Sequence, residues 1–239
     1  MFSSTRFSSA VVAVLLCCGL LGCAGVGTGA AAEVPGGKLR RSTQTQLEQV
    51  DAKLAAQKWD EALALLDGAG QGDLNPYEHA RLLEKRASVY SATKQYEQAA
   101  DALKQSVELK AMPEAEQVAT TYRLVNLYVG LRRHEDAVAL IESAGLPSKG
   151  PKPEQAFMLA LAYAGAKREE TALPHAKAAV AGSDTPAEEK LQLLCDLQQH
   201  LQHYAEAASV AERLVKSFPE HKGNYLRLAG SYEQLGRSR

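Results

Sequence analysis

Residues 90–99 read Tyr-Ser-Ala-Thr-Lys-Gln-Tyr-Glu-Gln-Ala, and this stretch decides the fold because its second half recurs along the chain. The recurring phrase is an aromatic or polar residue, two mostly polar residues and an alanine. Its five copies are Trp59-Asp60-Glu61-Ala62, Tyr96-Glu97-Gln98-Ala99, His134-Glu135-Asp136-Ala137, Glu169-Glu170-Thr171-Ala172 and Tyr204-Ala205-Glu206-Ala207. Their alanines are 37, 38, 35 and 35 residues apart. A period of about 34 residues is typical of arrays of helix-turn-helix units.

A tyrosine precedes three of these alanines at a fixed distance. Tyr90, Tyr128 and Tyr163 each stand nine residues before the alanine of their repeat, and Tyr232 is placed similarly in a last, partial unit. We expect two short antiparallel helices in each repeat, with the alanine where the second helix crosses the first too closely for a larger side chain. A single hairpin would leave an apolar face in water, so the repeats must stack to bury it.

The repeats resemble the tetratricopeptide family over residues 43–236. Further matching positions are Leu83, Ala87, Leu103, Leu124, Ile141, Leu159, Ala160, Leu191, Leu194 and the pair Phe218-Pro219. The resemblance implies an all-α fold, a right-handed superhelical solenoid of about five antiparallel helix pairs plus a terminal helix. In the fifth repeat, Gln198 stands where the pattern has a tyrosine. The first repeat keeps only Trp59 and Ala62 of the pattern, as expected of an N-terminal cap.

The composition agrees with an all-α chain and excludes some partners. Apolar residues make up 46% of the 239 residues and aromatic residues only 6%, a balance that suits helix packing better than a sheet. Lys and Arg total 27 against 28 Asp and Glu, so no basic excess favours nucleic acid. Cys195 is the single cysteine outside the first 23 residues and is expected to be a buried, unreactive thiol.

The first residues have the pattern of an export signal. Residues 1–22 contain Arg6 and an apolar run that is too short to span a bilayer as a helix. Leu20-Leu21-Gly22-Cys23 resembles a bacterial lipobox, which implies cleavage before Cys23, its acylation, and anchoring to the membrane; Ala24 favours the outer membrane, facing the periplasm. The alternative is cleavage after the alanines at 30–32, which releases a soluble periplasmic protein.

Residues 23–42 are therefore expected to be the lipidated cysteine and a flexible linker, residues 43–236 the solenoid, and residues 237–239 the C-terminal end. Helix-breaking stretches rich in Gly, Pro, Ser or Asp at 68–72, 147–153 and 183–186 are expected to separate the hairpins. The sequence stops half a repeat after Asn224, so residues 224–235 are expected to be either a lone capping helix or part of a truncated repeat.

The register of the family places a binding groove on the first helices of repeats three to five. The groove residues it implies are Tyr122, Asn126, Phe157, Leu161, Gln192 and Asp196. Aromatic side chains on an open groove would anchor a bound helix or extended segment, whereas the alternative is that both rings pack between repeats. The Lys and Asn cluster that clamps a terminal carboxylate in some relatives is missing at these positions.

No catalytic motif is found, so the chain is interpreted as a non-enzyme without cofactor, metal or small-molecule substrate. His200 and His203 share a helical face, but a metal site needs three or four convergent ligands.

The function expected from these features is an interaction scaffold that binds protein partners in the bacterial envelope. The phrases Thr171-Ala172-Leu173-Pro174-His175-Ala176 and Tyr225-Leu226-Arg227-Leu228-Ala229-Gly230 are similar to those of tetratricopeptide proteins encoded beside TonB-ExbB-ExbD systems. That resemblance implies an accessory role in energised outer-membrane transport. The alternative is the non-catalytic helical part, or the activator, of a cell-wall (peptidoglycan) enzyme or envelope assembly machine.

Overall fold

A computed structural model describes residues 38–147, 150–183 and 185–237, and every regular element within these ranges is an α-helix. The predicted signal peptide and the lipidation site Cys23 lie outside the described residues. The described chain falls into two compact units, residues 38–131 and residues 132–237, which are considered separately below. No described helix is both long enough and apolar enough to cross a membrane.

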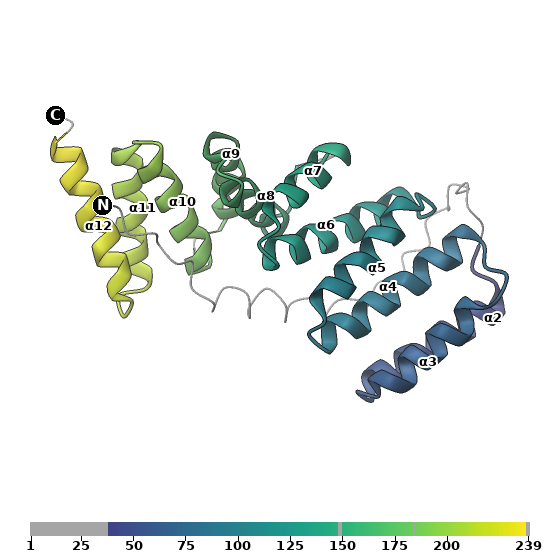
Figure 1. The fold of residues 1–239 in the computed structure, drawn as a ribbon. Helices are drawn as coiled ribbons and strands as arrows, with labels where there is room; N and C mark the ends of the chain where they lie inside the picture. Colours follow the sequence, from purple (N-terminus) through teal and green to yellow (C-terminus); the bar gives the residue numbers. More distant parts are fainter. Residues whose placement is uncertain (1–37, 148–149, 184, 238–239) are drawn as a thin grey trace. The chain divides into compact units, whose positions relative to one another are not determined.

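The N-terminal unit contains two hairpins and a further helix (Figure 1). Helices α2 (Arg41–Ala55) and α3 (Trp59–Gly70) form the first hairpin, and α4 (Pro76–Ala92) and α5 (Tyr96–Glu108) form the second. Helix α6 (Glu114–Gly130) packs on α5. A core around Leu47, Val50, Leu66 and Val89 joins the hairpins.

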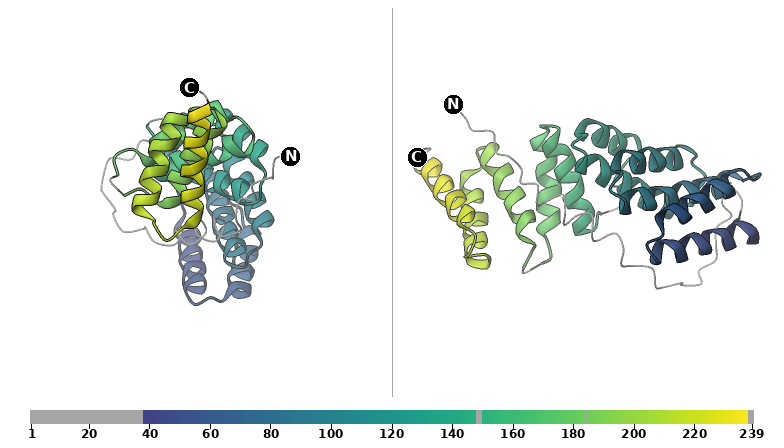
Figure 2. Two further views of the ribbon diagram at one scale, coloured as in Figure 1. Left: turned by 90° about the vertical axis from the view of Figure 1, so that its left-hand side faces the viewer. Right: turned by 60° about the horizontal axis from the view of Figure 1, so that its bottom comes forward.

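The C-terminal unit begins with α7 (His134–Ser143), which packs on α8 (Pro153–Gly165). Helix α8 pairs with α9 (Glu169–Val180), and α10 (Glu188–His200) pairs with α11 (Tyr204–Ser217). Helix α12 (Lys222–Arg237) packs on α11 at the end of the unit, as both views of Figure 2 show. The order of helices confirms the prediction of an all-α array of about five pairs plus a terminal helix.

The turns between first and second helices share one backbone conformation. One residue of each turn lies in the left-handed region with φ between 57° and 62°, namely Gln57, Lys94, Arg132, Lys167 and Gln202. Each of these residues precedes the alanine of its repeat by five positions. The next amide then reaches back to the first helix, as when Gln95 N donates to Tyr90 O at 2.8 Å and Arg168 N donates to Tyr163 O at 2.8 Å. This pair of features is the usual way for a helix to satisfy its last carbonyl groups.

The recurring alanines occupy the crossing points that the repeat pattern predicts. Ala62, Ala99, Ala137, Ala172 and Ala207 all have no exposed surface. In the fifth repeat the Cys195 Sγ lies 3.6 Å from the Ala207 carbonyl oxygen, so the second helix approaches α10 with its backbone. A larger side chain at the alanine position would push the two helices apart.

One local feature differs from the sequence expectation, and a second was not predicted. The glycine-rich stretch at 68–72 does not break the chain at its start, because α3 continues to Gly70 before the loop. The second is the cap at the start of α4: the side chain of Asn75 accepts from Glu78 N while the side chain of Glu78 accepts from Asn75 N, and Pro76 is the first helical residue. This reciprocal capping satisfies two amides that have no partner inside the helix.

Candidate protein-interaction site

The six predicted groove residues lie on first helices, as the register requires. Tyr122 and Asn126 are on α6 in the N-terminal unit, whereas the other four are on α8 and α10 in the C-terminal unit. The structure therefore describes two sets of groove residues, one in each unit.

The two aromatic groove residues are buried rather than open. Tyr122 and Phe157 are each only 6% exposed, and burial raises the pKa of the Tyr122 hydroxyl. Asn126 and Leu161, one helical turn further along, are half-buried. The burial agrees with the alternative that the rings pack between helices, and their role in binding a partner stays a prediction.

The two groove residues of α10 bind the terminal helix. Gln192 Nε2 donates to Asn224 Oδ1 at 3.2 Å, and Asp196 accepts two hydrogen bonds from Arg227, one from Nε at 2.7 Å and one from Nη2 at 3.1 Å. Gln199 adds a bond to Ser231 Oγ at 2.7 Å. These side chains hold α12 against α10, so their present contacts are structural.

A polar network in the N-terminal unit lies in the same register one repeat earlier. Glu84 and Ser88 of α4 stand 38 residues before Tyr122 and Asn126, the spacing of the alanines of those two repeats. Glu84 is a buried carboxylate that accepts from Arg81 Nη1 at 2.7 Å and from Thr120 Oγ1 at 2.6 Å. Arg123 of α6 links both α4 residues, with Nη1 3.3 Å from Glu84 Oε1 and Nη2 3.2 Å from Ser88 Oγ.

A second carboxylate continues this network toward the start of the helices. Glu116 accepts from the Tyr77 hydroxyl at 3.1 Å and lies 3.4 Å from Arg81 Nη1. Burial, followed by the charge of Glu116, raises the pKa of Tyr77. We call Tyr77, Arg81, Glu84, Ser88, Glu116, Thr120 and Arg123 together the α4–α6 polar network.

The α4–α6 polar network consists of paired charges on the first helices of two neighbouring repeats. Its two guanidinium groups face two carboxylates, so the charges balance and no excess positive charge is left to attract an anion. Arg123 keeps 46% of its side chain exposed, and the burial of its other part lowers the pKa of the guanidinium. Arg81 Nε has no hydrogen-bond partner in the described structure. This nitrogen is itself buried, so it is not open to a partner.

Sequence reasoning missed this network although a signal was present. The groove was assigned to repeats three to five, and extending the same register to repeat two points to Glu84 and Ser88. Arg123 and Thr120 could not be found this way, because they stand one and two residues away from the groove positions of their own repeat.

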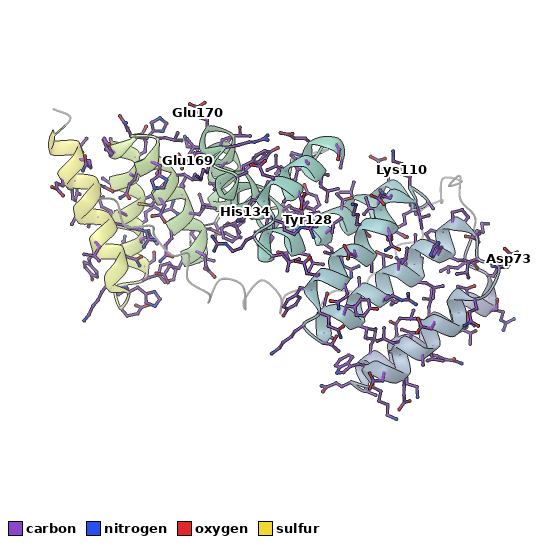
Figure 3. All side chains as sticks on the ribbon, in the orientation of Figure 1. Asp73, Lys110, Tyr128, His134, Glu169 and Glu170 are labelled. Atoms are coloured by element: carbon purple, nitrogen blue, oxygen red, sulfur yellow. The ribbon has the colours of Figure 1, made fainter. Side chains whose placement is uncertain are left out.

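The prediction that His200 and His203 share a helical face is wrong, because His200 is the last residue of α10 and His203 lies beyond the turn, before α11. His200 Nδ1 lies 2.9 Å from Oε1 of Glu169 on α9, and Glu169 is labelled in Figure 3. Among the described residues, no group of three or more His, Cys, Asp or Glu side chains is placed to hold a metal ion.

Comparison with known proteins identifies the fold. No family model matches the chain, and no curated protein matches it by sequence. The structure resembles YrrB, a tetratricopeptide protein with an unusual peptide-binding site, with a TM-score of 0.64 at 15% identity over 75% of this chain and 88% of YrrB. The chain has a tetratricopeptide-type fold.

Two further solved structures share this tetratricopeptide-type fold. MamA from Desulfovibrio magneticus RS-1 gives a TM-score of 0.60 at 14% identity, covering 77% of this chain and 99% of the MamA chain. PilW, a type IV pilus biogenesis factor, gives 0.55 at 13% identity, covering 83% of this chain and 93% of PilW. At these identities the likeness concerns the fold alone.

Proposed function

We propose that this protein is a non-enzymatic scaffold that binds an extended or helical segment of a protein partner on the first-helix face of its repeats. The observation that carries the proposal is the α4–α6 polar network, which leaves the half-exposed side chains of Arg123 and Glu116 on the face shared by the first helices α4 and α6. The peptide-binding site named for YrrB and the role in type IV pilus biogenesis named for PilW support a protein partner for a fold of this kind.

The binding face is best probed through its accessible residues. Because Tyr122 and Phe157 are buried, replacing them with alanine would remove core packing as well as any contact with a partner. Ser88, Arg123 and Asn126 are half-buried or exposed, so they report on the surface itself.

Site-specific photo-crosslinking tests the proposal. A photoreactive residue at Asn126 or Ser88, introduced into the full chain in its native bacterial envelope, should crosslink to one discrete protein identified by mass spectrometry. The matched control is the exposed Lys104 on second helix α5, which should not give that product. Arg123→Ala should reduce the crosslink at least fivefold while helicity stays constant. Equal products from positions 88, 126 and 104 would contradict the proposed face.

We further propose that Cys23 carries a lipid that holds this scaffold on the outer membrane. The sequence Leu20-Leu21-Gly22-Cys23 supports this placement. Cys23→Ser should move the protein from the detergent phase to the aqueous phase in detergent partitioning, or leave an unprocessed precursor. A wild-type protein that is already found in the aqueous phase points to the soluble periplasmic alternative.

An accessory role in TonB-type transport is the finer form of this proposal, and it is supported by the sequence phrases at 171–176 and 225–230. The crosslinking experiment tests it directly, since the product would then contain a component of such a system. A peptidoglycan enzyme in the product would support the alternative role as part or activator of a cell-wall enzyme.

A further inference from the structure

His134 of α7, which is labelled in Figure 3, places its ring against the backbone of α8. A side-chain carbon on Gly165 would overlap this ring, so glycine is what allows the two helices to approach so closely at this point. The ring is half-buried, and its Nδ1 is buried without a hydrogen-bond partner in the described structure. An imidazole nitrogen in such a place is best held without a proton, so the hydrogen of the neutral ring belongs on Nε2.

The charged groups around this ring do not favour a proton on Nδ1. Residues 132–136 and 165–167, from the start of α7 and from the turn before α9, line an open cavity beside the ring. The charged side chains that line it are Arg132, Arg133, Lys167, Glu135 and Asp136. Burial is the main cause that lowers the pKa of His134; the charge of Arg132 lowers it further, and Glu135 opposes both.

Both carboxylates of this cavity are paired with arginines. Asp136 Oδ2 accepts from Arg133 Nε at 2.7 Å, and Glu135 Oε2 lies 3.5 Å from Arg168 Nη2. On α8, the titratable residue nearest in sequence to Gly165 is Tyr163, whose ring stacks on His175 of α9. None of these groups is bonded to His134 Nδ1, so a proton there would stay buried without an acceptor unless the ring moves.

The next repeat has a different arrangement at the same two positions. His134 and Glu169 each open the phrase of their repeat, and Gly165 and His200 each stand seven residues before the alanine of their repeat. In this second pair His200 Nδ1 lies 2.9 Å from Glu169 Oε1. A proton at that contact is shared with a carboxylate, so acid favours the contact between α9 and α10.

We infer that the contact between α7 and α8 is a pH-sensitive joint, in which a proton on His134 Nδ1 drives the ring away from Gly165 and loosens α7. Protonation turns Nδ1 into a donor, and a buried donor without an acceptor destabilises the closed joint. Helix α7 can respond locally because it is the shortest described helix, with 10 residues, of which Ala137, Val138 and Ile141 are buried. The joint does not depend on the proposed partner-binding face, and either can fail without the other.

The sign of the pH effect follows from the proton. Because the pKa of His134 is lowered in the closed joint, the closed form loses stability as pH falls below the ordinary histidine value of about 6.5. If the ring regains that ordinary value on opening, the population of the open form should rise by up to about tenfold between pH 7.5 and pH 5.5. Above pH 7.5 the opening should be independent of the charge of His134.

Hydrogen exchange of the full chain, followed by mass spectrometry, measures this opening. The exchange rate of the amides at 138–143 is divided by the intrinsic rate at each pH, which removes the chemical pH dependence of exchange. We expect this ratio to be at least threefold higher at pH 5.5 than at pH 7.5. His134→Gln should remove the difference, and so should His134→Tyr, which introduces the residue that opens the second and fifth repeat phrases.

Two other histidines supply matched controls. His175 is also half-buried, but its ring nitrogens are not among the buried atoms without a partner, so His175→Phe should keep the threefold difference at α7. His200→Gln, which removes the pair with Glu169, should keep it too. Gly165→Ala tests the contact itself, since it should raise the exchange of α7 at pH 7.5 and reduce the effect of acid.

Three results would overturn the inference. One is equal corrected exchange of α7 at the two pH values in the parent chain. Another is a difference that persists in both His134 variants. The third is a pKa of His134 at or above 6.5 in an NMR titration of the parent chain, because the closed joint would then not exclude the proton.

Discussion

The Sγ of Cys195 and the carbonyl oxygen of Ala207 lie 3.6 Å apart, with both residues fully buried. At this point the side chain of Cys195 lies directly against the backbone of α11. The same alanine position is fully buried in all five repeats.

Ala207→Leu should therefore destabilise the protein by about 1–3 kcal/mol, because the added side chain must separate α10 from α11. Urea unfolding followed by circular dichroism measures the change. The matched control is Ala205→Leu, two residues away on the exposed face of α11, which should change the free energy of unfolding by less than about 0.5 kcal/mol. Equal losses for the two variants would contradict the tight crossing.

The Cys195 thiol should be almost unreactive in the folded protein. Burial, followed by the neighbouring charge of Asp196, raises the pKa of the thiol to about 11, well above the ordinary value. Iodoacetamide at pH 8 should label the peptide containing Cys195 at least a hundredfold more slowly in buffer than in 8 M urea, as followed by mass spectrometry. Rapid labelling of the native protein would show that the α10–α11 contact opens.

The left-handed turn residues predict opposite effects for two substitutions at one site. Lys94 has φ of 62°, where a side chain costs about 1 kcal/mol and glycine costs almost nothing. Lys94→Gly should keep or raise the stability of the protein by up to about 1 kcal/mol, whereas Lys94→Val should lower it by about 1–2 kcal/mol. Thermal melts of the two variants beside the parent measure the difference, and a loss with glycine as large as that with valine would refute the role of the turn.

Glu78 should make the stability of the N-terminal unit depend on acid pH. The side chain of Arg40 is the main cause that lowers the pKa of this buried carboxylate to about 2, and Thr43 Oγ1 donates a further bond at 2.8 Å. Because the folded pKa lies below the unfolded value of about 4.3, the contribution is complete above pH 5 and is lost as pH falls from about 4 toward 2.

Glu78→Gln removes this contribution at neutral pH. We expect the variant to lose about 1–3 kcal/mol at pH 7, the range for a hydrogen bond to a charged group, and to lose less than the parent between pH 5 and pH 3. Urea midpoints at pH 7, 5 and 3 test both expectations. Parallel pH profiles for the parent and the variant would assign the acid sensitivity to other carboxylates.

The sequence by itself determined the repeat and its register. The alanine phrase and the tyrosines nine residues before it predicted antiparallel hairpins, because a crossing point and the ring beside it are local requirements that recur with every repeat. The same register, extended by one repeat, reaches Glu84 and Ser88 and, at the other end, marks Tyr225, Ala229 and Tyr232 as a first-helix face.

Only the tertiary structure decided which of these positions are buried. Tyr122 and Leu226 hold the same place in their repeats, yet Tyr122 is 6% exposed and Leu226 is 74% exposed. Burial depends on neighbours that are more than thirty residues away in the chain. A repeat pattern does not predict whether such a neighbour is present. For the same reason the pairing of Arg123 with Glu84, 39 residues apart, came from the packing of α6 beside α4 and not from any motif.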